Sequence, residues 1–203
     1  MRNYWILILI FAFLWYIGDH RGEVSLGPGV MAPQAPYQKD LTQAQTFRFK
    51  DMEIQPMAEF HVKAKVLSAK DYGFFDAMSH LSPIDLGLGW GRMSDEKIVS
   101  QIEFRQSGRW MFWNARNAWP IPIEETEDSS SNMHMIPAED YLADAMKAVR
   151  VGDIVEFTGY LVRVRGNRGE QWNSSLSRED KGNGACEIVY VSSFANLTEA
   201  IKS

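Results

Sequence analysis

Residues 58–67 read AEFHVKAKVL, and the regular alternation in this stretch decides the fold class. Apolar side chains occupy every second position, and charged or polar side chains occupy the positions between them. Successive side chains of a β-strand point to opposite faces of its sheet, so the pattern predicts one face in a core and one in water. The sequence therefore predicts a domain built mainly from β-strands.

Further strand and turn signals follow along the chain. Ser107-Gly108 separates two short apolar stretches and predicts a hairpin. In the longest later strand the alternation changes near Gly159, as it does at a β-bulge or a barrel corner. Two glycine-rich turns then lead into shorter strands. The strands expected in this part are residues 102–106, 110–113, 153–165, 171–176 and 186–191.

Two helices are expected between these strands. Ser94 is placed to cap a short helix over residues 95–99. Residues 137–150 predict a clearer amphipathic helix, with proline in the first turn, acidic residues near the N-terminus and basic residues near the C-terminus. The order of strands, one helix and further strands is that of a small closed barrel of the OB type. The expected fold class is mainly β with one or two short helices, as an OB-like or related β-barrel domain.

An uninterrupted apolar run from Tyr4 to Ile17, YWILILIFAFLWYI, precedes the domain. A membrane-spanning helix needs about 20 residues. Residues 1–18 approach this length and carry tyrosine and tryptophan at both ends, where interfacial anchors occur. The rival interpretation, a cleaved secretory signal, needs a small-residue cleavage motif that residues 18–21 (GDHR) do not supply. We therefore expect a single-pass transmembrane anchor in a bacterial inner membrane, with the soluble domain in the periplasm.

The rest of the chain divides into a linker and one domain. Residues 19–45 contain scattered glycine and proline without sustained periodicity, which predicts a spacer. Residues 46–203 suffice for a single β-rich domain with a hydrophobic core. The formal net charge of −5 disfavours nucleic acid as the main partner. The single cysteine, Cys186, excludes an intramolecular disulfide.

Four segments resemble those of an uncharacterised family of bacterial membrane-anchored proteins. They are residues 81–91 (LSPIDLGLGWG), 132–137 (NMHMIP), 174–180 (SSLSRED) and 182–187 (GNGACE). The resemblance extends over the whole chain and implies the same arrangement of an N-terminal anchor and a β-rich domain. It implies no activity, because none is associated with that family.

Cys186 and His134 are the candidates for nucleophilic catalysis. With Asp180 or Glu187 to orient the histidine they would form a triad, because such groups need proximity in space and not in sequence. The context of Cys186 opposes this role, since it opens an expected strand beside the anion Glu187 and negative charge raises a thiol pKa. A buried structural thiol is therefore favoured, and a cysteine-dependent hydrolase is kept as an alternative.

Met133-His134-Met135 offers sulfur and imidazole ligands that suit copper(I). In a regular strand the two methionines share one face and His134 points away, so a single ion would need an irregular loop here. An extracytoplasmic ligand or metal carrier is the corresponding second alternative. His61 and His80 lack ligands at metal-site spacing and are expected to be solvated or structural. The sequence predicts no bound cofactor.

The leading functional interpretation is a non-enzymatic binding or assembly module, such as an accessory subunit of a cell-envelope complex. Aromatic residues of the domain would contact a protein partner, with Trp90, Trp113 and Trp119 as the expected contacts. Tryptophans also stack on nucleic-acid bases, but the negative net charge opposes contacts with backbone phosphates. The expected partners are the membrane, through Tyr4 to Ile17, and a protein of the envelope.

Overall fold

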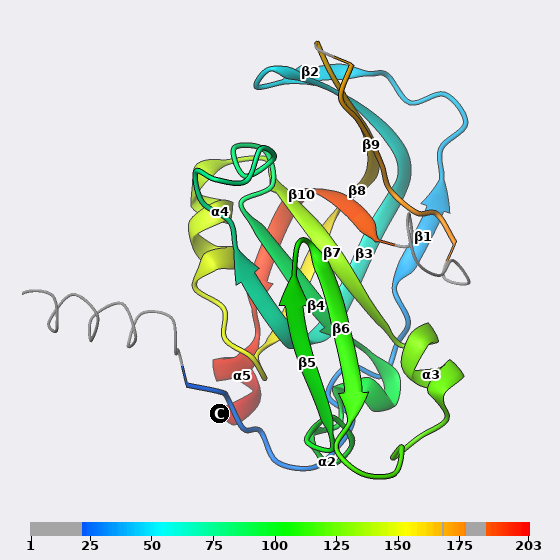
Figure 1. Cartoon of the computed structure of the whole chain (residues 1–203), viewed down its shortest axis with the longest axis vertical. Coiled ribbons are helices and arrows are strands. Elements are labelled where there is room, and N and C mark those ends of the chain that lie inside the picture. The colour runs from blue at the N-terminus through cyan, green and yellow to red at the C-terminus, as the bar shows by residue number, and fades with distance from the viewer. Residues whose placement is uncertain (1–21, 168, 178–185) are drawn as a thin grey trace, which may run out of the picture.

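The alternating stretch at residues 58–67 is part of a longer strand, β3 (Met52–Asp71), in the computed structural model of the protein (Figure 1). The structure describes residues 22–167, 169–177 and 186–203, which are mainly β with short helices between the strands. The other elements are, in chain order, β1 (Tyr37–Asp40), β2 (Phe47–Phe49), β4 (Ile84–Gly89), the 3-10 helix η1 (Gly91–Ser94), α2 (Glu96–Val99), β5 (Ile102–Ser107), β6 (Trp110–Ala115), α3 (Ile123–Asp128), β7 (Ser130–Pro137), α4 (Asp140–Lys147), β8 (Ile154–Gly166), β9 (Gln171–Asn173), β10 (Glu187–Asn196) and α5 (Thr198–Lys202).

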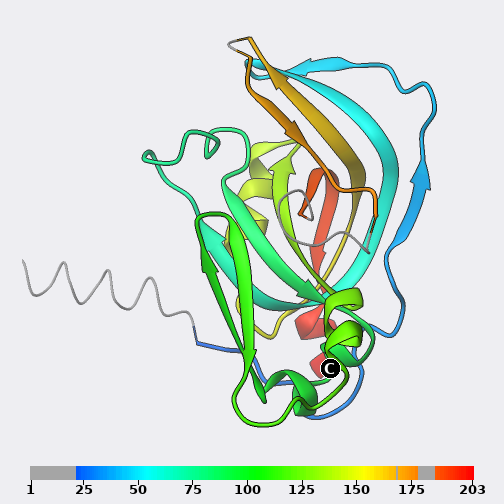
Figure 2. The ribbon, with the colours of Figure 1, turned by 45° about the vertical axis from the view of Figure 1, so that its right-hand side comes forward.

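The strands of the main sheet form a closed ring of pairings. Strand β3 pairs with β4, the pairing continues through β7, β10 and β8, and β8 returns to pair with β3 along residues 52–65. Strands β7 and β10 run parallel, whereas the other neighbours in the ring are antiparallel. Strands β1 and β2 pair with the edge of β3 that lies opposite β8. The hairpin β5–β6, confirmed where the sequence predicts it, forms a separate sheet outside the ring (Figure 2).

The ring encloses the main hydrophobic core. The apolar side chains of β3 enter it as predicted, since Phe60, Val62 and Val66 are buried there beside Phe157 of β8. Burying a side chain of this size stabilises the fold by roughly 1.5–3 kcal/mol relative to exposing it. The other elements contribute Leu86, Leu88, Met133, Met135, Leu142, Met146, Val189 and Val191.

Helix α4 follows β7 in the chain and precedes β8. Its apolar stripe packs on the core through Leu142 and Met146, as its amphipathic pattern predicts. The helix is shorter than the predicted range 137–150, because Pro137 still pairs with Val191 at the end of β7. A proline is tolerated at a strand end, where its missing N–H breaks no ladder. The helix is therefore confirmed in position and shortened at both ends.

The change of alternation in β8 lies close to its predicted place. Leu161 belongs to the main core, whereas Val162 belongs to a second apolar cluster. The pairing register shifts opposite this point, where Met57 is an extra residue that makes a β-bulge in β3. Gly159 itself marks a close approach of two strands, since a Cβ there would lie 2.0 Å from the carbonyl oxygen of Tyr190. The β-bulge therefore lies in β3, the strand that pairs with β8, and not at Gly159.

The prediction that Ser94 caps the short helix is wrong. Asp95 caps α2, and its carboxylate accepts a hydrogen bond from the N–H of Lys97. The Ser94 hydroxyl instead accepts from the N–H groups of Met31 and Ala32. Both residue types are good caps. Asp95 also accepts a hydrogen bond from the N–H of Gly29, so both residues contact the N-terminal segment.

The described part of the predicted linker, residues 22–45, is packed against the domain and does not act as a spacer. Val24 donates its N–H to the carbonyl oxygen of Val151, and Ala32 is buried. The carboxylate of Glu96 accepts hydrogen bonds from two successive N–H groups of the segment, and β1 pairs with β3. Backbone hydrogen bonds to other elements fix a segment that has no periodicity of its own.

The predicted membrane anchor, Tyr4 to Ile17, lies outside the described residues. Within residues 22–167, 169–177 and 186–203, no helix combines the length and the apolar character needed to cross a bilayer.

Candidate functional site

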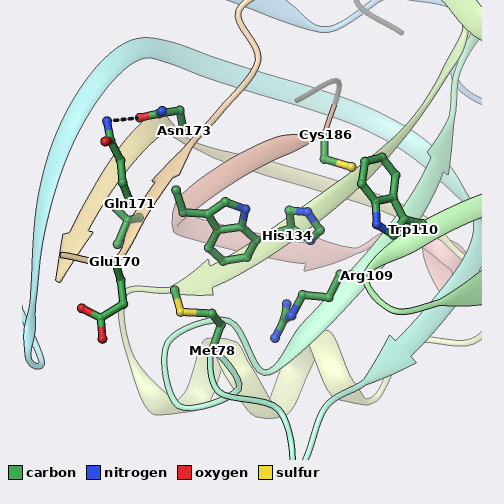
Figure 3. Close-up of a pocket in the computed structure, with 10 residues that line it drawn as sticks. Met78, Arg109, Trp110, His134, Glu170, Gln171, Asn173 and Cys186 are labelled. Atoms are coloured by element: carbon green, nitrogen blue, oxygen red, sulfur yellow. Dashed lines mark hydrogen bonds between the residues drawn. The ribbon is translucent and has the colours of Figure 1, made fainter. Parts of the chain in front are cut away.

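A pocket of about 520 Å³ opens on the outer face of the ring beside β7. Alternation along β7 directs Met133 and Met135 into the core, so that His134 points outward to the pocket (Figure 3). The volume falls within the range of roughly 300–1,000 Å³ that is typical of small-molecule sites. This aromatic pocket is lined by Met78, Arg109, Trp110, His134, Val164, Glu170, Gln171, Trp172, Asn173 and Cys186.

The turn between β5 and β6 places Arg109 in the pocket wall. Gly108 and Arg109 are the central residues of this turn, and both have positive φ, +56° and +68°. Two positive φ values in a two-residue hairpin turn match the twist of the flanking strands. Glycine adopts this conformation freely, whereas an arginine does so at a cost of roughly 1–2 kcal/mol. The contacts of the Arg109 side chain must offset that cost.

The Arg109 guanidinium is engaged by β4 and by the loop that precedes it. Its Nη2 donates to Asp76 Oδ1 at 2.7 Å, and its Nε donates to Asp76 Oδ2 at 3.0 Å. Its Nη1 donates to Asp85 Oδ1 at 3.0 Å, while Nη2 also donates to the carbonyl oxygen of Ser82 at 2.9 Å. The hydrogen bond from Arg109 lowers the pKa of Asp76. Because these partners occupy the donors of the guanidinium, Arg109 holds the hairpin against the ring and does not offer itself to an anionic ligand.

Asp85 is a buried anion shared by two elements of the pocket wall. Its Oδ1 lies 2.9 Å from His134 Nδ1 and 3.0 Å from Arg109 Nη1, and its side chain is fully buried. The contact between Asp85 Oδ1 and His134 Nδ1 has the distance of an ion pair without the geometry of a hydrogen bond. Within the described residues, His134 Nδ1 and the other carboxylate oxygen, Asp85 Oδ2, have no hydrogen-bond partner. Burial, and then the charge of Asp85, raise the pKa of the nearby Tyr72 hydroxyl. Tyr72 therefore stays neutral at physiological pH.

Aromatic rings complete the wall. The rings of Trp172 and His134 lie with their centroids 4.5 Å apart at an angle of 39°. Arg109 Cζ lies 3.9 Å from the ring centroid of Tyr72 and 5.4 Å from that of Trp172, which are cation–π distances. Trp172 also packs against the second apolar cluster, which contains Val164 of β8. The aromatic rings in this wall are thus held in place by contacts on several sides.

The charges around the aromatic pocket are mostly negative. Arg109 faces Asp76 and Asp85, and Glu170 lines the side next to β9. Among the residues that the structure describes at this wall, one cation, already paired, thus stands against three carboxylates. A phosphate or a carboxylate would be repelled here, whereas a planar apolar group that is neutral or cationic would be accommodated.

The structure brings Cys186 and His134 to the same pocket, as the catalytic interpretation requires (Figure 3). Burial raises the pKa of the Cys186 thiol to about 11, the amide of Asn132 lowers it, and the charge of Glu187 raises it further. The Asn132 Nδ2 atom lies 3.8 Å from the sulfur. A thiol that is protonated at neutral pH is a poor nucleophile, and this opposes catalysis by Cys186.

The two expected orienting residues of the triad have different outcomes. Asp180 lies outside the described residues. Glu187 is buried, and its carboxylate accepts a hydrogen bond from the hydroxyl of Ser131. The carboxylate beside His134 is that of Asp85, which the sequence analysis did not name as a site residue. In the sequence, Asp85 is marked by being a single acidic residue inside the apolar stretch 84–88.

The predicted copper ligands do not converge. Met133 and Met135 are fully buried in the core, and His134 points to the opposite face of the regular strand β7. Among the residues that the structure describes, no group of three His, Cys, Asp or Glu side chains is arranged to hold a metal ion. His61 and His80 make surface contacts with carboxylates, at 3.1 Å and 3.0 Å respectively, in agreement with a structural role.

The predicted partner contacts differ in accessibility. Trp90 is only 3% exposed and belongs to the core, so it is out of reach of a partner, contrary to the expectation. Trp113 and Trp119 are half-buried, and their rings meet edge to face at 5.3 Å over a third apolar cluster beneath the hairpin. Their contact with a partner stays a prediction. Trp110 and Trp172 line the aromatic pocket instead.

The arrangement around Asp85 has to be interpreted from its own geometry. No family model, no curated protein and no solved structure matches this chain.

Proposed function

We propose that this chain is a membrane-anchored, non-enzymatic binding module whose recognition site is the aromatic pocket. The observation that carries the proposal is the wall in which Trp172, His134 and Arg109 meet around the buried carboxylate of Asp85. Such a wall is fixed before any ligand arrives, which reduces the entropic cost of binding. The ligand group that it suits is planar and apolar, and either neutral or positively charged.

The domain that presents this pocket is proposed to be a small barrel of the OB type. Support comes from the closed order β3-β4-β7-β10-β8, from the parallel pair β7–β10, and from α4 between β7 and β8. OB folds bind ligands on the face of their second and third strands, between the loops after the first and fourth strands. Asp85 and His134 belong to the corresponding strands β4 and β7, while Met78 and Trp172 come from the flanking loop regions.

The apolar run from Tyr4 to Ile17 supports an anchor in a bacterial inner membrane, with the domain in the periplasm. In that location the ligand group would be part of an envelope protein or a free small molecule, and both share the chemistry described above. The charge of the pocket argues against nucleic acid, since stacked bases would bring their phosphates towards Asp76 and Glu170.

The proposal is tested by a series of three ligands of nearly equal shape: benzamidine, benzamide and benzoate. The full-length protein, in detergent micelles and labelled with 5-fluorotryptophan, is titrated with each ligand and followed by ¹⁹F NMR. The resonance of Trp172 is assigned from its loss in Trp172→Phe. Benzamidine and benzamide are expected to shift this resonance, and benzoate is expected to leave it in place because of the surrounding carboxylates.

The resonance of Trp113, assigned through Trp113→Phe, provides the internal control. Trp113 packs under the hairpin away from the aromatic pocket, so benzamidine and benzamide should not shift it. A shift of Trp172 by benzoate equal to that by benzamide would contradict the proposed charge preference. Unchanged Trp172 resonances with all three ligands at millimolar concentration would contradict binding in this pocket.

A further inference from the structure

A second cavity, of about 490 Å³, lies at the other end of the β5–β6 hairpin. The turn of the hairpin at Arg109 contributes to the aromatic pocket, whereas its base, at Ile102 and Arg116, contributes to this cavity. Strand β3 forms the floor, and apolar side chains such as Leu67 and Phe104 line the walls. The cavity is therefore independent of the aromatic pocket and of the function proposed for it.

The floor of this cavity carries a buried amine, that of Lys65. Ala64 and Val66 on either side of it enter the core, so Lys65 starts from the outer face of β3, beneath the hairpin. The residue is only 2% exposed, and within the described residues its Nζ has no hydrogen-bond partner. Burial lowers the pKa of Lys65, while the charges of Glu96, Asp95 and Asp153 act in the opposite direction. A buried ammonium group without a contact partner is costly, and a bound anion would remove that cost.

Two more polar atoms of residues that line the cavity are also buried without a hydrogen-bond partner in the part of the chain that the structure describes. Ser68 Oγ and Gln106 Oε1 are buried and have no hydrogen-bond partner within the described residues. The orientation of the Gln106 amide follows from its neighbours: Asn132 Nδ2 donates to the carbonyl oxygen of Arg109 at 2.9 Å, so Asn132 Oδ1 accepts from Gln106 Nε2 at 2.5 Å. The carbonyl of Gln106 is thus left as an acceptor. One cation, one hydroxyl and one acceptor thus belong to the lining of a cavity in which apolar and polar side chains are mixed.

The charged side chains that line the cavity balance one another, although Asp95 and Asp153 outside the lining also act on Lys65. The carboxylate of Glu96 is already engaged by the Ser25 hydroxyl and by two N–H groups of the same segment. An anion that enters the cavity therefore meets equal numbers of acidic and basic lining residues, and the contact with Lys65 decides its affinity. The charged lining residues are three acids, Glu23, Glu96 and Glu103, and three bases, Lys65, Lys70 and Arg116.

We propose that this cavity binds a small carboxylate with an apolar body, and that Lys65 Nζ donates a charge-assisted hydrogen bond to the carboxylate. The hydroxyl of Ser68 and the carbonyl of Gln106 supply further polar contacts for such a ligand, and Leu67, Ile102 and Phe104 contact its apolar part. Polar groups placed to fix the orientation of a ligand beside apolar side chains are typical of a small-molecule site.

The test compares phenylacetate with phenylacetamide, which has nearly the same shape but no charge. Each is titrated into the full-length Trp172→Ala protein in detergent micelles, because the aromatic pocket of the wild type would itself take up the neutral amide. Binding is followed by calorimetry, with micelles alone as the blank. Phenylacetate is expected to bind, and phenylacetamide to bind at least about tenfold more weakly, because the charge-assisted bond to Lys65 is lost. Equal affinities for the two compounds, or no binding of phenylacetate at millimolar concentration, would overturn the proposal.

Substitutions test whether phenylacetate binds in this cavity. Lys65→Met removes the amine at nearly constant length and should abolish phenylacetate binding, whereas Lys63→Met on the same strand, outside the cavity lining, should leave it unchanged. Trp172→Ala should also leave it unchanged, which separates this cavity from the aromatic pocket. Phenylacetate binding that survives Lys65→Met, or that is lost in Trp172→Ala, would contradict the assignment. If far-UV circular dichroism shows that Lys65→Met does not fold, the comparison of the two compounds on the Trp172→Ala protein still tests the proposal.

Discussion

Asp85 Oδ1 lies 2.9 Å from His134 Nδ1, and the two residues are direct partners in the pairing of β4 with β7. The register of these strands therefore brings the carboxylate and the imidazole together on the outer face of the ring. The same oxygen accepts a hydrogen bond from Arg109 at the turn of the hairpin. One buried atom thus positions side chains from two ring strands and from a separate sheet.

The first prediction follows from this shared carboxylate. Asp85→Asn should lower the free energy of unfolding by about 2–3 kcal/mol, because it removes the charge that compensates a largely buried Arg109, which still retains Asp76. The measurement is equilibrium unfolding in urea. Asp51→Asn is the control, since Asp51 pairs with His80 at the surface, and it should change the free energy by no more than about 0.5 kcal/mol. Equal effects of the two substitutions would contradict the buried role of Asp85.

The second prediction concerns the backbone of Arg109. Arg109→Ala and Arg109→Gly lose the same guanidinium contacts, but only glycine relieves the positive φ of +68°. The glycine variant should therefore be more stable than the alanine variant by about 1 kcal/mol, although both should be less stable than the wild type. Urea unfolding of the three proteins measures the difference. An alanine variant at least as stable as the glycine variant would show that the turn does not impose this conformation.

Much of the local structure was predictable because it depends on short-range patterns. The alternation of residues 58–67, the glycine in the turn after Ser107 and the apolar stripe of α4 each carry a signal within one element. The closed barrel was expected only from the order of the elements, and the pairing that closes the ring has no local signal, because β3 and β8 pair although about a hundred residues separate them in the chain. The mainly β fold class is confirmed.

The candidate site was predicted only in part, and for the same reason. His134 and Cys186 were named because their side chains have functional chemistry of their own, and they do line one pocket. Asp85 and Arg109 acquire their roles from contacts across the fold, which no periodicity reveals. Lys65 is the clearest case: the alternation predicts a solvated lysine, but the hairpin that covers β3 buries it.

The third prediction tests the packing of the segment that the sequence marks as a linker. Gly152 has a φ of +93°, and a Cβ there would lie 1.9 Å from the carbonyl oxygen of Val24. Gly169 has a similar φ of +90°, with nothing within 4 Å of such a Cβ. Gly169→Ala should therefore cost about 1 kcal/mol for backbone strain alone, and Gly152→Ala should cost clearly more because it displaces the segment. Equal losses in urea unfolding would indicate that residues 22–32 do not stay packed on the domain.

The last prediction concerns the thiol of Cys186. Burial raises its pKa from an ordinary value of 9.0 to about 11, so the fold favours the protonated form. This contribution to stability is fully present below a pH of about 9, where the unfolded thiol is also protonated, and it is lost as the pH rises towards about 11. The difference in free energy of unfolding between the wild type and Cys186→Ala should therefore be constant from about pH 7 to 8.5 and should then decline, while groups that titrate in both proteins cancel. Iodoacetamide should label the native thiol slowly at neutral pH. Rapid labelling there, abolished by His134→Ala in a folded protein, would instead show a thiolate activated by the histidine and would restore the hydrolase interpretation.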